Sequence, residues 1–401
     1  MSRNTPPSIM VLDGDNANAL PVATELSEDL DATIIGVGTS DWSRLLRSRH
    51  CDVGATTVHA SHPQYAERVL ELLDVYRPDL LLPLGHGSVS ALEGVRDRLP
   101  EDVACSLPPS ESLDIALDKL ATGEVAKYLD VGRPEEYTDH VRELRAGGRP
   151  DDVADLPFPL FLKARFERGR TVTARVDEPS EFWSTYEDVE ADAETEVVVQ
   201  SYVPGDRTFG VGLLYDEGTP RLLFAHEEIQ SVPRRGGTGT RVRVFRDPRI
   251  ETDALRLLDS LDWHGPALVE FKRRPDGSYA LMEINPKFWA SYALASRSGY
   301  RFASTLAARA LDLSSPNFRR VPDQTGEMVF PLQELQFAAG AADESVLQSA
   351  ASMLWPPTAM DINVRDIGAW LTPPTSVDDV DALDTDGGPG IAVDETDVWS
   401  A

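Results

Sequence analysis

The sequence predicts a mixed fold, α/β in its first part and α+β in its second, and three observations favour this class. The chain has 401 residues, which is long enough for two or three domains. Short apolar strands alternate with helical stretches over the first hundred residues, as in small parallel sheets covered by helices. From about residue 195 onward, strands separated by short turns predominate, which is typical of antiparallel sheet.

Residues 1–110 are expected to form a small doubly wound domain. Its first turn, LDGDNANAL, contains a single glycine and so lacks the GxGxxG pattern of dinucleotide-binding turns. A generic dinucleotide enzyme is therefore disfavoured. The expected elements are a strand and turn over 9–15, strands over 32–38, 54–60 and 79–85, and amphipathic helices over 19–30 and 62–77.

Residues 111–313 are expected to form the second unit. One long helix is predicted over 110–130, capped by Ser110 and with Glu111 in its first turn. A polar loop is expected to follow to about residue 155. Further elements are a strand over 158–166, three strands and two turns over 195–229, a hairpin over 263–289 and helical periodicity over 291–313. Residues 314–401 are expected to hold short strands and a frayed end rich in Gly, Asp and Pro.

The composition is strongly acidic and nearly free of lysine. The formal net charge is −29, which argues against a nucleic-acid partner. Five lysines stand against thirty-three arginines, a pattern that resembles proteins from salt-accumulating cells. The first residues lack a secretory signal, and no apolar run approaches membrane-spanning length, so we expect a cytoplasmic protein without a membrane partner. Cys51 and Cys105 are far apart and are expected to be inert thiols.

The hairpin over 263–289 contains the clearest candidate site. If its turn spans 275–278, Glu270 and Glu283 face each other with Cβ atoms about 5 Å apart, and Asn285 projects from the same side. Two carboxylates and an amide oxygen are ligands that suit Mg²⁺. The alternative is a hydrated, solvent-facing strand, which the apolar neighbours disfavour. The expected cross-strand pairs are Lys272–Leu281, Glu270–Glu283 and Leu268–Asn285.

The stretch LVEFKRRPDGSYALMEINPKFWAS resembles the metal-binding hairpin of the ATP-grasp superfamily, in its carboxylate–amine ligase and carbamoyl-phosphate-synthetase-like branch. The resemblance implies an ATP-grasp fold in which Glu270, Glu283 and Asn285 hold Mg²⁺ against the phosphates of ATP. Two ions are expected, with Mn²⁺ as an alternative. It also implies that Lys287, where the family usually has Arg, faces the reacting phosphoryl group.

The resemblance extends over residues 9 to 313 and implies the remaining assignments. Residues 1–110 would be the Rossmann-like pre-ATP-grasp domain, 111–313 the ATP-grasp domain with its lid at about 135–198, and 314–401 a C-terminal extension. Arg235, or its neighbour Arg234, would anchor a substrate carboxylate. The nucleotide-binding residues would be Lys119 and Lys163 at the phosphates, Gln200, Ser201, Tyr202 and Val203 at the adenine, and Asp206 at the ribose.

One segment departs from the family pattern. Its lid loop is usually rich in Gly and Ser, whereas ARFERGRTVT has Gly169 alone with Arg165, Arg168 and Arg170. Guanidinium groups are then expected to grip the phosphates in place of backbone amides. A lid of this composition also leaves room for weaker ATP binding or for another purpose.

The resemblance implies an ATP- and Mg²⁺-dependent ligase that joins a small carboxylate to an amine through an acyl phosphate. One alternative is an ATP-grasp enzyme that forms carboxyphosphate or carbamoyl phosphate from bicarbonate. A second alternative is a non-catalytic ATP-binding sensor or scaffold. No nucleic acid or membrane is expected among the partners, and a homodimer is left open.

Overall fold

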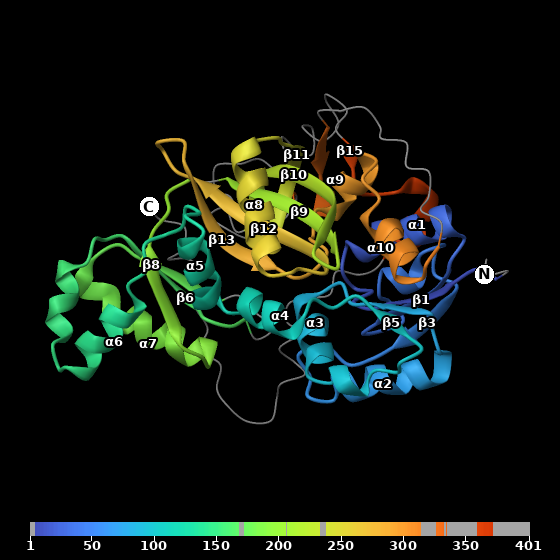
Figure 1. The fold of residues 1–401 in the computed structure, drawn as a ribbon, viewed down its shortest axis with the longest axis horizontal. Helices are drawn as coiled ribbons and strands as arrows, with labels where there is room; N and C mark the ends of the chain where they lie inside the picture. The colour runs from blue at the N-terminus through green and yellow to red at the C-terminus, as the bar shows by residue number, and fades with distance from the viewer. Residues whose placement is uncertain are drawn as a thin grey trace.

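The computed structural model describes residues 5–167, 172–205, 207–232, 238–313, 326–332, 334 and 359–371. Within these ranges the strands form a five-stranded, a seven-stranded and a three-stranded sheet. Figure 1 shows the five-stranded sheet at one end of the molecule, the three-stranded sheet at the other, and the seven-stranded sheet between them. The predicted mixture of α/β and α+β architecture is confirmed.

The five-stranded sheet is parallel, in the order β3-β2-β1-β4-β5. Side chains of β1 and of Leu12 directly after it alternate between the two faces of the sheet, because Ile9 and Val11 join one apolar core and Met10 and Leu12 join another. The strands are β1 (Ser8–Val11), β2 (Thr33–Gly38), β3 (Val53–Thr56), β4 (Leu80–Leu82) and β5 (Ala104–Cys105), and the helices are α1 (Ala19–Leu30), α2 (Tyr65–Tyr76) and α3 (His86–Glu93). Short 3-10 turns lie at Leu45–Arg47 (η1) and Arg96–Arg98 (η2).

The seven-stranded sheet has the order β13-β12-β9-β10-β11-β14-β15 and is antiparallel except between β14 and β15. One face packs against α8 (Pro248–Ser260), and the other packs against α1 and the helices that follow β13. Gly212 of β9 leaves room for the Trp289 ring, since a Cβ there would lie 2.3 Å from it. The strands are β9 (Thr208–Asp216), β10 (Thr219–Val232), β11 (Thr238–Val244), β12 (Gly265–Arg273), β13 (Tyr279–Asn285), β14 (Glu327–Val329) and β15 (Ala359–Met360).

The three-stranded sheet, in the order β7-β6-β8, and its two helices form a separate layer that we call the lid. The polar loop expected up to residue 155 is wrong, because residues 138–146 form a helix whose Val141 and Leu144 enter the lid core. The lid elements are α6 (Thr138–Ala146), η3 (Pro150–Asp155), β6 (Leu160–Ala164), β7 (Thr173–Val176), η4 (Pro179–Glu181), α7 (Phe182–Ala193) and β8 (Val197–Ser201).

The long helix predicted over 110–130 is broken in the structure, and the helical stretch over 291–313 forms two helices. The helix expected over 110–130 is α4 (Ser110–Leu117) followed by α5 (Lys119–Tyr128), because Asp118 has an extended backbone and caps α5. Ser110 makes no side-chain cap, so that part of the prediction is also wrong. The stretch over 291–313 divides into α9 (Tyr292–Arg297) and α10 (Phe302–Ala310), with Gly299 at a φ of 88° between them.

The described part of the C-terminal region joins both large units. β14 pairs with β11 at the edge of the seven-stranded sheet, and the 3-10 helix Val364–Trp370 (η5) packs against η1 of the N-terminal unit. Buried Asp366 accepts hydrogen bonds from Ser48 Oγ at 2.6 Å and from the Arg49 amide at 2.8 Å. No helix in the described ranges is long and apolar enough to cross a membrane.

Candidate active site

The β12–β13 hairpin has the predicted register at the candidate residues. Glu270 faces Glu283, and Leu268 faces Asn285, as expected. The expected Lys272–Leu281 pair is wrong, since Lys272 faces Ala280 instead. A bulge between these pairs inserts one extra residue into β13, and bulges of this kind re-aim side chains next to active sites.

The three polar side chains of the hairpin converge on one face of the sheet. Asn285 Nδ2 donates to Glu270 Oε2 at 2.8 Å and to Glu283 Oε1 at 2.9 Å. Burial, and next the charge of Glu283, raises the pKa of Glu270 well above its usual value. Burial opposes ionisation of Glu283 too, but the hydrogen bond from Glu270 and the Lys119 ammonium outweigh it and lower the pKa of Glu283. The two carboxylates therefore repel each other when both are ionised, and a cation would offset this repulsion.

Glu228 is a third carboxylate whose charge acts on this pair, and no pattern in the sequence pointed to it. It lies on β10, two strands from β12, and its charge contributes to the raised pKa of Glu270. Burial raises the pKa of Glu228 to about 8. Gly239 on β11 leaves space for this side chain, because a Cβ there would lie 2.9 Å from Glu228 Oε1. Only the strand order brings Glu228 near Glu270, so no local pattern of residues points to it.

Two lysines from other elements reach the hairpin. Lys119, the first residue of α5, lies with its Nζ 3.4 Å from Glu167 Oε1, and Lys163 of β6 donates to the Met282 carbonyl at 3.4 Å. The Lys163 side chain is only 5% exposed, and burial together with the Lys119 charge lowers its pKa to about 8. Both ammonium groups favour the ionised form of Glu283. The structure therefore brings together the two lysines that were expected at the phosphates.

The N-terminal unit contributes His86, which was not among the residues expected at the site. His86 begins α3, directly after β4, and its ring Nδ1 is buried with no hydrogen-bond partner among the described residues. Burial lowers the pKa of His86, and the charges of Glu167, Lys287 and Glu283 act on it from across the site. Lys287 thus lies near both the hairpin carboxylates and the N-terminal unit.

The strand order reverses between β1 and β4, which is where open α/β sheets usually bind ligands. Here Asp13 fills the turn after β1. Its carboxylate accepts from the amides of Leu84 and Gly85 and from Ser88 Oγ, at 2.9, 2.8 and 2.6 Å. These contacts join the turn after β1 to the segment that connects β4 to α3.

The expected adenine hinge lies at the end of β8. The amides of Ser201 and Tyr202 already donate to the carbonyls of Glu135 and Pro159, at 2.8 and 3.1 Å, so these two groups do not donate to an adenine. The side-chain amide of Gln200 is buried and donates to the Glu136 carboxylate. Val203, which follows, is buried as well. Asp206, Arg234 and Arg235 lie outside the described residues.

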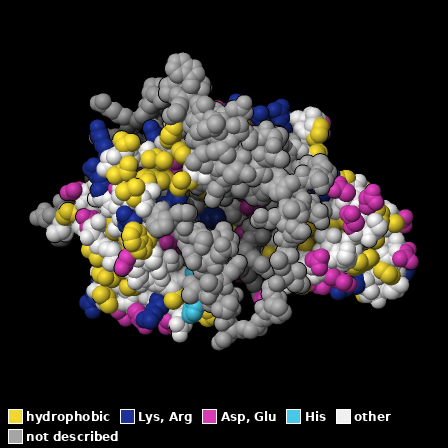
Figure 2. All heavy atoms as spheres, turned by 180° about the vertical axis from the view of Figure 1, so that it is seen from behind, with side chains coloured by type: hydrophobic (Ala, Val, Ile, Leu, Met, Phe, Trp, Pro, Cys, Tyr) yellow, Lys and Arg dark blue, Asp and Glu magenta, His cyan; other side chains and the backbone are white. Residues whose placement is uncertain are grey.

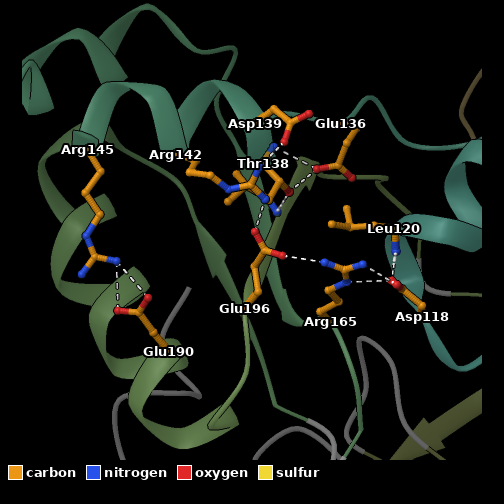
Figure 3. Close-up of polar contacts among 11 residues, drawn as sticks. Asp118, Leu120, Glu136, Thr138, Asp139, Arg142, Arg145, Arg165, Glu190 and Glu196 are labelled. Atoms are coloured by element: carbon orange, nitrogen blue, oxygen red, sulfur yellow. Dashed lines mark hydrogen bonds and ion pairs between the residues drawn. The ribbon is translucent and has the colours of Figure 1, made fainter. Parts of the chain in front are cut away.

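Arg165 does not point to a phosphate site, contrary to the expectation for the lid arginines. Its guanidinium forks onto Asp118, with Nε 2.9 Å from Oδ1 and Nη2 2.5 Å from Oδ2, and Nη1 donates to Glu196 at 2.8 Å. Figure 3 shows Arg165 between these two carboxylates. Arg168 and Arg170 lie outside the described residues.

The candidate set differs from a conventional metal cluster. The described residues contain no group of three or more His, Cys, Asp or Glu side chains placed to hold a metal ion. The hairpin instead offers two carboxylates and an amide. A cavity of about 530 Å³ lies elsewhere, around Arg96, Asp262 and His264, and none of its lining residues belongs to the candidate set.

The fold of this chain is similar to those of several solved structures. No family model matches the sequence, and no curated protein matches it. Biotin carboxylase from Campylobacter jejuni is similar in structure, with a TM-score of 0.63 and 14% identity over 78% of this chain and 72% of that one. The biotin carboxylase domain of the Hydrogenobacter thermophilus 2-oxoglutarate carboxylase, solved with MgADP, ADP and bicarbonate, has a TM-score of 0.61 and 14% identity over 80% and 73% of the two chains.

A third similar structure is the N5-carboxyaminoimidazole synthetase from Staphylococcus aureus. Its TM-score is 0.57, with 14% identity over 78% of both chains. These structures are ATP-grasp proteins, and the chain described here has the ATP-grasp fold. The fold expected from the hairpin resemblance is confirmed.

Proposed function

We propose that this chain is an ATP- and Mg²⁺-dependent ligase that joins a carboxylate to an amine through an acyl phosphate. The observation that carries the proposal is the convergence of the hairpin carboxylates with two lysines from separate elements. Glu270 and Glu283 come from the seven-stranded sheet, Lys119 from α5 and Lys163 from the lid. The ATP-grasp fold supports the same interpretation.

Glu270, Glu283 and Asn285 would hold magnesium. Their chemistry fits a hard cation, because two carboxylates and an amide oxygen are the ligand types that Mg²⁺ selects. A cation there would also offset the repulsion between the two carboxylates, to which the charge of Glu283 on Glu270 testifies. Bound Mg²⁺ supplies charge neutralisation at the phosphates of ATP. We propose two ions, with Mn²⁺ as a substitute.

The basic side chains would act on the phosphates and the reacting end. Lys119 and Lys163 would neutralise phosphate oxygens, and Lys287 would face the transferred phosphoryl group or the substrate carboxylate. The γ-phosphoryl group passes to a carboxylate oxygen and ADP leaves. The amine nitrogen then attacks the acyl carbon, phosphate departs with the former carboxylate oxygen, and the amine loses a proton. Catalysis of this kind depends on positioning and charge stabilisation.

The same proposal assigns residues to the adenine, to the ribose and to a substrate carboxylate. Adenine would lie at the hinge formed by Gln200, Ser201, Tyr202 and Val203. Because the backbone amides of Ser201 and Tyr202 already donate to protein carbonyls, other polar groups of the hinge would contact the edge of the base. Asp206 would contact the ribose, and Arg235 would anchor a carboxylate. We also propose a cytoplasmic location in a salt-rich cell, with a homodimer left open.

A second candidate function is the formation of carboxyphosphate from bicarbonate. It is favoured by the similar structures named above, one of which was solved with bicarbonate. Here bicarbonate would take the place of the carboxylate and receive the γ-phosphoryl group.

The test is a screen for ADP release at molar salt. Amino acids and small carboxylates would be paired with amines, with and without bicarbonate. We expect wild type to release ADP with at least one carboxylate and amine pair, and Glu283→Gln to release none and to bind Mg-ATP more weakly. Glu187→Gln, on the exposed side of α7, is the matched control and should behave as wild type.

The outcomes separate the candidates. ADP release that depends on bicarbonate alone would favour carboxyphosphate formation. Mg-ATP binding without ADP release across the whole panel would indicate a sensor or scaffold. Equal Mg-ATP affinity of wild type and Glu283→Gln would show that the metal assignment is wrong.

A further inference from the structure

The charged contacts between the lid and α5 form one chain of alternating sign. Arg142 of α6 donates to Glu196, which also accepts from Arg165 at 2.8 Å. Arg165 in turn forks onto Asp118 at the start of α5. Figure 3 shows these side chains in sequence from the lid to α5, with the Arg145–Glu190 pair lying apart between α6 and α7.

Asp118 has two functions in this chain. Its Oδ1 caps α5 by accepting from the amides of Leu120 and Ala121, at 2.9 and 3.3 Å. The same carboxylate receives two nitrogens of the Arg165 guanidinium, and its side chain is only 11% exposed. The Lys119 amide donates to the carbonyl of Arg165, the residue directly after β6, at 3.3 Å, so the backbone and the side chain of Arg165 both contact the start of α5. Arginine suits this place because its planar fork matches a carboxylate.

Each partner of this ion pair is a close sequence neighbour of one of the two lysines at the site. Asp118 precedes Lys119, and Arg165 follows Lys163 by two residues. The two ammonium groups repel each other, since the Lys119 charge lowers the pKa of Lys163. A contact that joins their backbones therefore opposes the repulsion between their side chains.

We propose that Arg165 is a positioning residue that fixes the separation of Lys119 and Lys163, so that both lysines engage the phosphates of one nucleotide. This inference rests on the proposed function. It assigns a role to the residue that stands where the family's lid loop is usually rich in glycine. Arg165 acts on the phosphates only through Asp118 and the backbone of α5, and it does not contact them.

The test compares the binding of ATP and of adenosine at one fixed salt concentration. Adenosine has no phosphates, so it reports on the hinge, whereas ATP reports on the hinge and the lysines together. We expect Arg165→Gln to weaken Mg-ATP binding by roughly tenfold or more and to leave adenosine binding within about twofold. Arg165→Lys retains the charge without the fork and should lie between these values.

Two further variants separate positioning from lid stability. Asp118→Asn retains the helix cap but removes the charge that holds Arg165, so it should reproduce the Arg165→Gln result, and the double variant should add little to it. Arg145→Gln breaks the Arg145–Glu190 pair, whose nitrogen–oxygen distances are 2.8 and 3.0 Å, inside the lid alone. It should leave the affinity for ATP unchanged.

The results that overturn the inference are distinct from those that overturn the function. Equal loss of ATP and adenosine binding in Arg165→Gln would show general damage to the lid, and unchanged ATP binding would show no positioning role. Either result overturns the inference alone if wild type binds Mg-ATP. Failure of wild type to bind Mg-ATP would overturn the proposed function and this inference with it.

Discussion

Lys163 carries its charge in surroundings that oppose the charge. Its side chain is buried on β6, and its pKa falls from 10.5 to about 8 because of burial and the Lys119 charge. Each pKa unit corresponds to about 1.4 kcal/mol, so the charged form is disfavoured by roughly 3 kcal/mol in the folded state. Under the proposed function, this lysine is retained for binding a nucleotide phosphate although its burial costs stability.

The first prediction follows from this conflict. Lys163→Met should keep or raise the free energy of unfolding at pH 7, by up to about 3 kcal/mol, while lowering Mg-ATP affinity by roughly tenfold or more. Chemical denaturation and nucleotide titration measure the two effects. Lys127→Met is the control, because its solvated ammonium on α5 has a side chain 62% exposed. Loss of stability without loss of affinity would show that Lys163 is only a structural residue.

Glu25 predicts a pH dependence in the joint between α1 and α9. This carboxyl is fully buried and accepts from Tyr292 Oη at 2.7 Å, and burial raises its pKa from 4.5 to about 7. A raised acid pKa means that the folded state binds the proton more tightly than the unfolded chain does. The stability from this group is therefore complete below about pH 4.5 and is lost as the pH rises through about 7.

Glu25→Gln mimics the protonated form and tests this directly. At pH 8 the variant should unfold with a free energy higher than that of wild type by up to about 3 kcal/mol, and the difference should shrink towards pH 5. Denaturant unfolding at a series of pH values measures it. A difference that does not change with pH would contradict the prediction.

At the scale of single elements, alanine substitutions of two glycines are expected to change the free energy of unfolding in opposite directions. Gly212 lies on β9 beneath the Trp289 ring, where a Cβ would approach ring atoms to 2.3 Å, whereas Gly123 lies inside α5 with nothing within 4 Å of a Cβ. Gly212→Ala should lower the free energy of unfolding by about 1–3 kcal/mol through overpacking. Gly123→Ala should raise it by about 0.5–1 kcal/mol through helix propensity. Denaturant unfolding midpoints of the two variants measure these changes. Changes of the same sign in both variants would contradict the prediction.

The same scale shows what the sequence could and could not predict. The pairing of Glu270 with Glu283 was predictable because the turn and the alternation of side chains determine which face each residue takes. The bulge that displaces the partner of Lys272 was not, because nothing in local composition distinguishes it. The break at Asp118 was missed because residues on both sides of it have helical periodicity, although Asp118 caps α5 and also binds Arg165 across the fold.

The candidate site could be predicted only in part, because some of its residues come together only through the tertiary fold. The lysines and the hairpin could be singled out by residue type and order, since charged residues stand out in apolar strands. Glu228 and His86 could not, because their places depend on the order of strands in two different sheets. Short strands were expected in the C-terminal region, but the bounds and pairing of β14 and β15 were not predictable, because strands this short carry no periodic signal.

For the whole molecule, the charge predicts the response to salt. The chain has 67 acidic and 38 basic residues, and Figure 2 shows acidic side chains gathered over the lid end. Salt weakens both this self-repulsion and the surface ion pairs, and the acidic excess makes the repulsion the stronger of the two interactions. We expect the unfolding midpoint to rise from 0.1 M to about 2 M KCl, where screening acts over only a few Å. Calorimetry at several salt concentrations measures it, and a falling midpoint would mean that the ion pairs dominate.

The contact between η5 and the N-terminal unit has a consequence for the order in which the protein is made. All strands of the first sheet are available for folding once residue 105 has left the ribosome. Ser48 and Arg49, however, can form their hydrogen bonds to Asp366 only after residue 366 has been made. The hairpin, the lid and the lysines of α5 are all translated in the interval. The last described helix therefore packs on one of the first segments made, and a nascent chain completes the hairpin, the lid and α5 before η5 can contact the unit that carries His86.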